Sequence, residues 1–189
     1  MDASDEQLLR QYVAGETAAM NELFVRYKAS VYSWLCSVSG QEAEDIYQDV
    51  WLRVISKAHT FKGMSFRVWL WSIARNLLVD RLRKKHALVI LDESVSEDKE
   101  MPKTLLETIA SESPGILETM TQRERKEALS AAINSLSYKL KEVVLLRVYS
   151  ELPFKEIARV LDLNLNTVLF RMHMAVVRLK ELLGERGVS

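Results

Sequence analysis

The stretch FKGMSFRVWLWSIARNLLVDRLRKK, residues 61–85, decides the fold of the first half of the chain. Its apolar side chains recur at i, i+3, i+4, i+7 and i+11, the spacing of one helix face, and they are Phe66, Trp69, Leu70, Ile73 and Leu77. Ser65 stands directly before them, where a serine can cap a helix. The polar segment 59–65, which contains Gly63, precedes this helix. We therefore expect a loop at 59–65 followed by an amphipathic helix.

The same spacing occurs twice upstream of this stretch. One helix face is formed by Met20, Leu23, Phe24, Tyr27 and Val31, and a second by Ala43, Ile46, Tyr47, Val50, Trp51 and Val54. Three amphipathic helices within about 65 residues are enough for a small bundle. The chain has only six glycines and three prolines, and no segment shows the alternation typical of a sheet. An all-α protein is predicted.

The middle of the chain differs in composition from both ends. The whole chain has a formal net charge of zero, but residues 87–122 hold eight acidic and two basic side chains. Acidic, serine-bearing and proline-broken sequence is typical of a flexible linker. We predict a first domain at 1–90, an acidic linker at 91–121 and a second domain at 122–189, with the apolar Leu105–Ile109 as a possible short docking helix inside the linker.

The last third predicts a helix-turn-helix. It opens with a capping-box pattern, Thr121-Gln-Arg-Glu124. Two helix faces follow, formed by Leu129, Ala132, Ile133 and Leu136, and by Leu140, Val143, Val144 and Val148. Pro153 is suited to be the first residue of a helix that ends at Leu161. A break at 162–164 then leads into a longer helix through about Leu183, which is the order of a DNA-binding helix-turn-helix.

Several classes of protein are excluded by what the chain lacks. Cys36 is the only cysteine, so it forms no internal disulfide, and we expect it to be a small buried side chain. No apolar run reaches the roughly 18–20 residues of a membrane span, and the acidic N-terminus is unlike a secretory signal. We expect a cytoplasmic protein without membrane insertion. The three histidines, His59, His86 and His173, are scattered, so no enzyme, metal site or cofactor is expected.

The first domain resembles region 2 of the extracytoplasmic-function sigma factors, members of the sigma-70 family of RNA polymerase subunits. AEDIYQDVWLRV, residues 43–54, is similar to the family pattern A-E-D-x-x-Q-[ED]-x-[FW]-L. In that family the surface docks on the clamp helices of the polymerase β′ subunit. The resemblance therefore implies core-polymerase binding by Asp45, Gln48, Asp49 and Leu52. On the residues alone, a solvated helix face remains the alternative.

Residues 61–85 are similar to the family pattern F-x-G-x-S-F-R-x-W-L-x-x-I-A-R-N-x-x-x-D-x-x-R. In the family, the loop captures a base flipped from the −10 promoter element and the helix separates the strands. The resemblance implies −10 recognition and melting by Phe61, Lys62, Ser65, Arg67, Trp71, Ser72, Arg75, Asn76 and Arg83. Trp69 is expected in the core, whereas Trp71, off the apolar stripe, is a base-stacking candidate with core packing as the alternative. The basic run 81–85 is expected to grip phosphates.

The second domain resembles family region 4, which reads the −35 element and contacts the polymerase β flap. The implied DNA-binding residues are Lys155, Asn166, Thr167, Arg171, His173 and Arg178. The last helix departs from the family, with Asn166 for glycine, Leu169 for a basic residue, Phe170 for serine and Met174 for arginine. A patch of Leu169, Phe170, Met174 and Val177 is predicted to face outward, and exposed apolar patches usually mark protein contacts.

Two interpretations of this patch stay open. Either −35 recognition is atypical because a protein, such as an anti-sigma factor or the first domain, covers the patch, or the helix is a divergent but ordinary DNA reader. The resemblance implies a sigma factor that directs promoter-specific transcription initiation, bound to core RNA polymerase and promoter DNA and held inactive by an anti-sigma factor. The alternatives are a sigma-like module that sequesters a regulator without initiating transcription, and a helix-turn-helix repressor that would leave the first domain unexplained.

Overall fold

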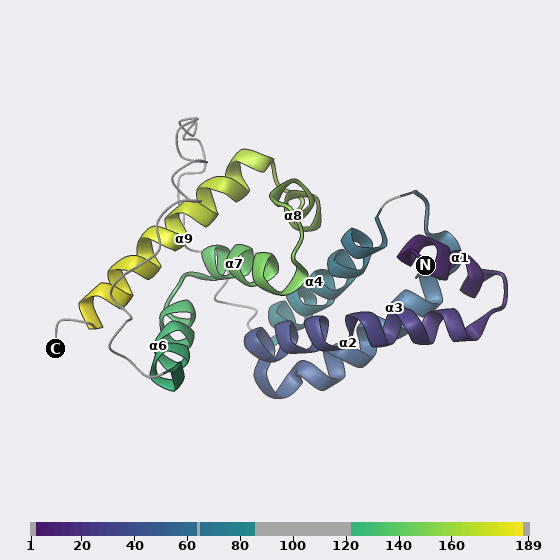
Figure 1. Ribbon diagram of the computed structural model, residues 1–189, viewed down its shortest axis with the longest axis horizontal. Coiled ribbons are helices and arrows are strands. Elements are labelled where there is room, and N and C mark those ends of the chain that lie inside the picture. Colours follow the sequence, from purple (N-terminus) through teal and green to yellow (C-terminus); the bar gives the residue numbers. More distant parts are fainter. Residues whose placement is uncertain (1–2, 64, 86–121, 187–189) are drawn as a thin grey trace. The chain divides into compact units, whose positions relative to one another are not determined.

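The computed structural model describes residues 3–63, 65–85 and 122–186, and every regular element within them is helical (Figure 1). The all-α prediction is confirmed. The described residues form two compact units, one of 3–85 with 146–163 and one of 122–145 with 164–186. The predicted linker at 91–121, its segment Leu105–Ile109 and Thr121 of the capping box lie outside the described residues.

The first unit is built on four N-terminal helices. They are α1 (Asp5–Val13), α2 (Thr17–Ser39), α3 (Ala43–Lys57) and α4 (Phe66–Lys85), with 3₁₀ turns η1 (Gly40–Glu42) and η2 (Ala58–Thr60) on either side of α3. Helix α1 packs on α2, and α3 packs on both α2 and α4. The apolar stripes predicted from the sequence point into this bundle, with Leu23, Val31, Val50 and Val54 fully buried.

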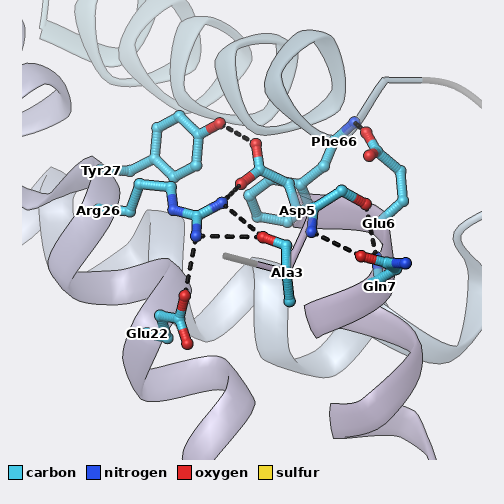
Figure 2. Close-up of polar contacts among 9 residues, drawn as sticks. Ala3, Asp5, Glu6, Gln7, Glu22, Arg26, Tyr27 and Phe66 are labelled. Carbon is cyan, nitrogen blue, oxygen red and sulfur yellow. Dashed lines mark hydrogen bonds and ion pairs between the residues drawn. The ribbon is translucent and has the colours of Figure 1, made fainter. Parts of the chain in front are cut away.

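Helix α1 was not predicted, although the sequence contains a signal for it. Ser4 and Gln7 form a reciprocal capping box, in which each side chain accepts a hydrogen bond from the other residue's backbone N–H. Leu8 and Leu9 are the buried residues of the helix. Asp5 anchors its start, because its carboxylate accepts hydrogen bonds from the Arg26 guanidinium and the Tyr27 hydroxyl of α2 (Figure 2). The short amphipathic stretch is therefore a docked helix.

The expectation that Trp71 lies off the core is wrong. Its side chain is 0% exposed and meets Trp34 of α2 edge to face, with ring centroids 5.4 Å apart. The error came from assigning α4 a single buried stripe. Val68 and Leu70 lie about 200° apart around a helix of 3.6 residues per turn, yet both are buried. Helix α4 is covered on two sides because α3 and α8 (Phe154–Leu161) both pack against it.

Residues 146–163 complete the first unit with the end of α7 (Tyr138–Ser150) and all of α8. Pro153 is the residue before α8 and not its first residue, a difference of one position. The guanidinium of Arg147 lies 5.5 Å from the centroid of the Phe154 ring, which holds the turn between the two helices. Asp162 ends α8 in the left-handed conformation, with φ 55°.

The second unit contains α6 (Gln122–Asn134), the start of α7 and the long helix α9 (Leu165–Arg186). Its core is a cluster of Leu136, Val144 and Ala175, against which Leu140, Met172 and Leu179 pack. The Asn164 side-chain oxygen accepts a hydrogen bond from the Thr167 N–H at 2.7 Å, so Asn164 caps the start of α9. The helix, three-residue break and longer helix expected at 153–183 are present in the element order.

Cys36 is exposed, contrary to the expectation of burial. The buried stripe of α2 continues through Val31, Trp34 and Leu35, and Cys36 falls on the far side of the helix from Trp34. Within the described ranges, no helix combines the length and the apolar character needed to cross a bilayer.

The burial of Trp71 gives a stability prediction. Trp71→Ala should lower the free energy of unfolding by about 3–5 kcal/mol, the usual cost of removing a large buried aromatic side chain. The matched control is Trp69→Ala, because Trp69 is only partly buried and should cost clearly less. Urea unfolding of the full chain, followed by circular dichroism, measures both. Equal small losses for the two variants would contradict the placement of Trp71 in the core.

Candidate nucleic-acid interface

Helix α3 presents a polar face on the side opposite its core. Asp45, Gln48, Asp49 and Leu52 are all exposed, while Ile46, Val50 and Val54 of the same helix are buried. The Leu52 side chain is 64% exposed, and Ile55, one turn further on, is 43% exposed. Ile55 was missed in the sequence, although its spacing of three residues from Leu52 places it on this face. An acidic stripe thus ends in an exposed apolar pair.

The basic residues at the end of α4 differ in their surroundings, because Arg81 is paired with acidic residues whereas Arg83 and Lys84 are exposed. Arg81, expected among the phosphate-gripping residues, instead pairs with Glu42 and Asp45, each with an N–O distance of 3.3 Å. These ion pairs join the end of α4 to the start of α3. The Asp45 side chain is still 70% exposed, and exposed pairs contribute little to stability. Arg83 and Lys84 are exposed and remain suited to a phosphate contact.

The loop between η2 and α4 is anchored by aromatic rings. The Phe61 ring packs on Trp69 of α4 with a centroid distance of 5.2 Å, and Phe66 packs on Trp69 at 5.9 Å. The Phe61 N–H donates to the carbonyl of Ala58 at 3.2 Å. Gly63 adopts φ 65°, a left-handed conformation that favours glycine. The loop therefore has a fixed start, while Lys62 and Gly63 are exposed.

The predicted polar face of α4 is only partly open to solvent. Asn76 and Arg83 are exposed, whereas Ser72 and Arg75 are partly buried. The Ser72 hydroxyl donates back to the Val68 carbonyl at 2.8 Å. The Arg67 guanidinium donates to the carbonyl of Ser150 within the first unit. Since Trp71 is in the core, the outward groups of this interface are Lys62, Asn76 and Arg83, with Phe61 and Ser65 half-buried beside them.

The residues of α9 predicted to bind DNA differ in their exposure to solvent. Asn166 and Arg178 are exposed, and Arg178 pairs with Glu181 at 2.8 Å. Lys155, on α8 in the first unit, is also exposed. Thr167 and Arg171, by contrast, are buried, so neither presents a free side chain to DNA in this arrangement. His173 lies between these extremes.

The predicted apolar patch on α9 needs one correction. Leu169 is only 7% exposed, so it does not belong to the outward face. Thr167, Val168 and Leu169 are consecutive and all buried, so the buried arc near the start of α9 is wider than the single stripe assumed from the sequence. Met174 is exposed, and Phe170 and Val177 are half-buried. The outward arc is therefore smaller and less apolar than expected.

Comparison with known proteins assigns both halves of the chain. The model for Sigma-70 region 2 matches residues 23–87, and the model for Sigma-70, region 4 matches residues 126–179. The ECF RNA polymerase sigma factor SigW of Bacillus subtilis is 27% identical over 176 residues, covering 92% of this chain and 93% of SigW. SigM of the same organism is 29% identical over 176 residues, covering 90% and 98%. The Escherichia coli sigma-E factor is 28% identical over 178 residues, covering 91% and 90%.

Two solved structures share the fold. CnrH, in a complex with the cytosolic domain of CnrY, gives a TM-score of 0.68 at 19% identity and covers 97% of this chain and 99% of its own. The sigma factor RpoE from Bartonella quintana, crystallised with the anti-sigma factor NepR, gives 0.63 at 20% identity and covers 87% and 96%. With both regions matched in the order that the two predicted domains require, the chain belongs to the extracytoplasmic-function RNA polymerase sigma factors of the sigma-70 family.

Proposed function

We propose that this protein directs promoter-specific transcription initiation. In this proposal residues 1–90 dock on core polymerase and melt the −10 element, residues 91–121 are an acidic linker, and residues 122–189 read the −35 element. The observation that carries the proposal is the junction of α3 and α4. An exposed acidic and apolar face on α3 lies in the same helical bundle as the loop and exposed polar groups of α4. A partner bound to α3 and DNA bound to α4 would thus contact one rigid body. This role is non-catalytic, requires no cofactor and belongs in the cytoplasm.

The α3 face suits a basic partner with an apolar groove. Asp45, Gln48 and Asp49 supply charge and polarity, which favour specificity and fast association. Leu52 and Ile55 supply apolar area that becomes buried on docking. By family resemblance, we assign this face to the clamp helices of the β′ subunit of core RNA polymerase.

The loop and α4 suit a strand that is being opened. Extruding a base costs a few kcal/mol, and least where the base is already unstacking. A loop with a fixed start can recover this cost by holding the extruded base, while Asn76, Arg83 and Lys84 meet the backbone. We assign −10 recognition and melting to this surface. Contacts from Arg83 and Lys84 to phosphates would make binding weaker at higher salt.

We assign the helix-turn-helix region to the −35 element and the β flap, with Lys155, Asn166 and Arg178 as its exposed polar groups. We further propose an anti-sigma factor as the regulator. The structure of RpoE from Bartonella quintana, which shares this fold, contains the anti-sigma factor NepR as its partner. The half-buried Phe170 and Val177 beside exposed Met174 offer such a protein a modest apolar contact.

Run-off transcription with purified core polymerase tests the function. The protein should confer initiation at discrete start sites on a fragmented genomic template, whereas core polymerase alone should not. A sigma-like module that only sequesters a regulator, or a stand-alone repressor, would bind its partner without producing specific transcripts. Either result would overturn the proposal.

Docking through α3 predicts the effect of Leu52→Ala. The affinity for core polymerase should fall about tenfold, which is the loss expected when an apolar side chain that anchors an interface is truncated. The stability of the protein should hardly change, because Leu52 is largely exposed. Val25→Ala on α2 is the matched control, as Val25 is 74% exposed and lies outside the docking face. Fluorescence anisotropy of the dye-labelled protein, titrated with core polymerase, measures both, and equal affinities would place docking elsewhere.

Because Met174 is exposed and Leu169 is buried, substitutions at these two positions of α9 should have different effects. Met174→Arg should raise the affinity for a −35 duplex a fewfold, by adding a cation where the family has arginine. Leu169→Lys should instead lower the free energy of unfolding by more than about 1 kcal/mol, because it puts a charge at a buried position. Duplex titration and urea unfolding measure the pair. An unchanged duplex affinity for Met174→Arg would show that this arc does not face DNA.

A further inference from the structure

We propose that Glu6, on helix α1, is a positioning residue for the loop at 59–65 and thereby sets how strictly the −10 element is read. The inference rests on the proposed function of that loop. Helix α1 lies outside the residues matched to region 2, which begin at residue 23. Its role in this chain therefore follows from its contacts with η2, α2 and α4.

A hydrogen bond joins α1 to the start of α4. The Glu6 Oε1 atom accepts from the Phe66 N–H at 2.9 Å (Figure 2), across 60 residues of sequence. Phe66 is the first residue of α4, and the first N–H groups of a helix have no partner within it. A capping serine accepts from the second or third of these groups. Glu6 satisfies the first, at a helix end that favours negative charge.

The position of Glu6 is fixed by the contacts of its neighbours with α2. Asp5, its neighbour, is bonded to Arg26 and Tyr27 of α2. Arg26 also donates to the carbonyl of Ala3, at 3.2 and 3.3 Å, and to Glu22 at 2.8 Å. The hydrogen bond from Phe66 holds the pKa of Glu6 below its ordinary value of 4.5. Glu6 is therefore ionised at neutral pH, and its contribution is lost only as the pH falls through that lowered pKa.

Contacts of α1 and of Phe66 connect Glu6 to the loop. Helix α1 contacts η2 as well as the start of α4, so it touches both ends of the segment between them. The Phe66 ring lies 5.6 Å from the Tyr27 ring and 5.9 Å from Trp69, and Trp69 holds Phe61. A shift of the Phe66 backbone would therefore move the support of Phe61. Helix α1 acts as a brace on the loop and not only as a cover for the core.

The test compares Glu6→Ala with Gln7→Ala. Gln7 belongs to the capping box of α1, where its side chain and backbone bond to Ser4, so its loss weakens α1 and leaves the acceptor of the Phe66 bond in place. Holoenzymes of both variants are titrated with fork-junction templates carrying a matched or a substituted −10 base, at a promoter found by run-off transcription. Glu6→Ala should reduce the ratio of the two affinities about fivefold to tenfold, which corresponds to the net contribution of one typical hydrogen bond. Core-polymerase affinity should stay unchanged.

Two further measurements keep the outcome decisive. Glu6→Gln, which has the same size and retains an acceptor oxygen, should recover part of the ratio and replaces the alanine variant if that variant unfolds. Hydrogen exchange at residues 59–70 should accelerate in Glu6→Ala but not in Gln7→Ala. A purely structural role predicts equal losses for matched and substituted templates.

The outcomes separate the inference from the function beneath it. If the wild-type holoenzyme shows no preference for any promoter, the proposed function fails and the inference fails with it. If the wild type discriminates and Glu6→Ala discriminates equally well, only the inference is overturned. A lower ratio of matched to substituted template affinity in Glu6→Ala, with Gln7→Ala near the wild type, supports the role of Glu6 in positioning the loop.

Discussion

The edge-to-face packing of Trp34 against Trp71 is the constraint on which the first unit depends. It fixes the rotation of α4 about its own axis, because the fully buried Trp71 side chain has one place in the core. Once this rotation is fixed, the polar residues that remain outside are determined. Asn76 and Arg83 face solvent, while Arg67 and Ser72 turn to backbone carbonyls of the protein itself. The interface is what the core leaves exposed.

Helices α3 and α4, which carry the two candidate faces, also pack directly against each other. Helix α3 is held on α4 mainly by packing, and Arg81 of α4 also reaches Glu42 and Asp45 at the start of α3. A displacement of α3 would therefore be transmitted to α4 through these contacts. Such coupling needs no long pathway, because the two faces belong to adjacent helices of one closely packed bundle.

The sequence predicted those parts of the fold that depend on local periodicity. Helix α3 begins at Ala43, where its apolar stripe starts, and the break before α9 lies where it was expected. The exposure of Asp45, Gln48, Asp49 and Leu52 follows from the same arithmetic. The errors arose where a helix is covered on more than one side. Trp71 and Leu169 lie off the main stripes and are nevertheless buried, Trp71 against Trp34 of α2.

Other features had no adequate local signal. The capping box of Ser4 and Gln7 indicated that a helix could start there, but not that it would dock on α2 and α4. The bond between Glu6 and Phe66 spans 60 positions, and nothing in either neighbourhood predicts it. Arg67 fits the family pattern as a DNA contact, and its bond to the Ser150 carbonyl depends on tertiary packing alone. Sequence patterns predicted the candidate interface residues, and packing determines which of those side chains are exposed.

The exposure of Cys36 has a chemical consequence. Because it is the only cysteine in the chain, its thiol can form a disulfide only with another molecule. Under oxidising conditions two copies could be linked through α2, while in reducing buffer the chain stays free of such links. The same thiol accepts a maleimide dye or spin label at a single known position, so the protein can be followed through holoenzyme assembly without any engineered cysteine.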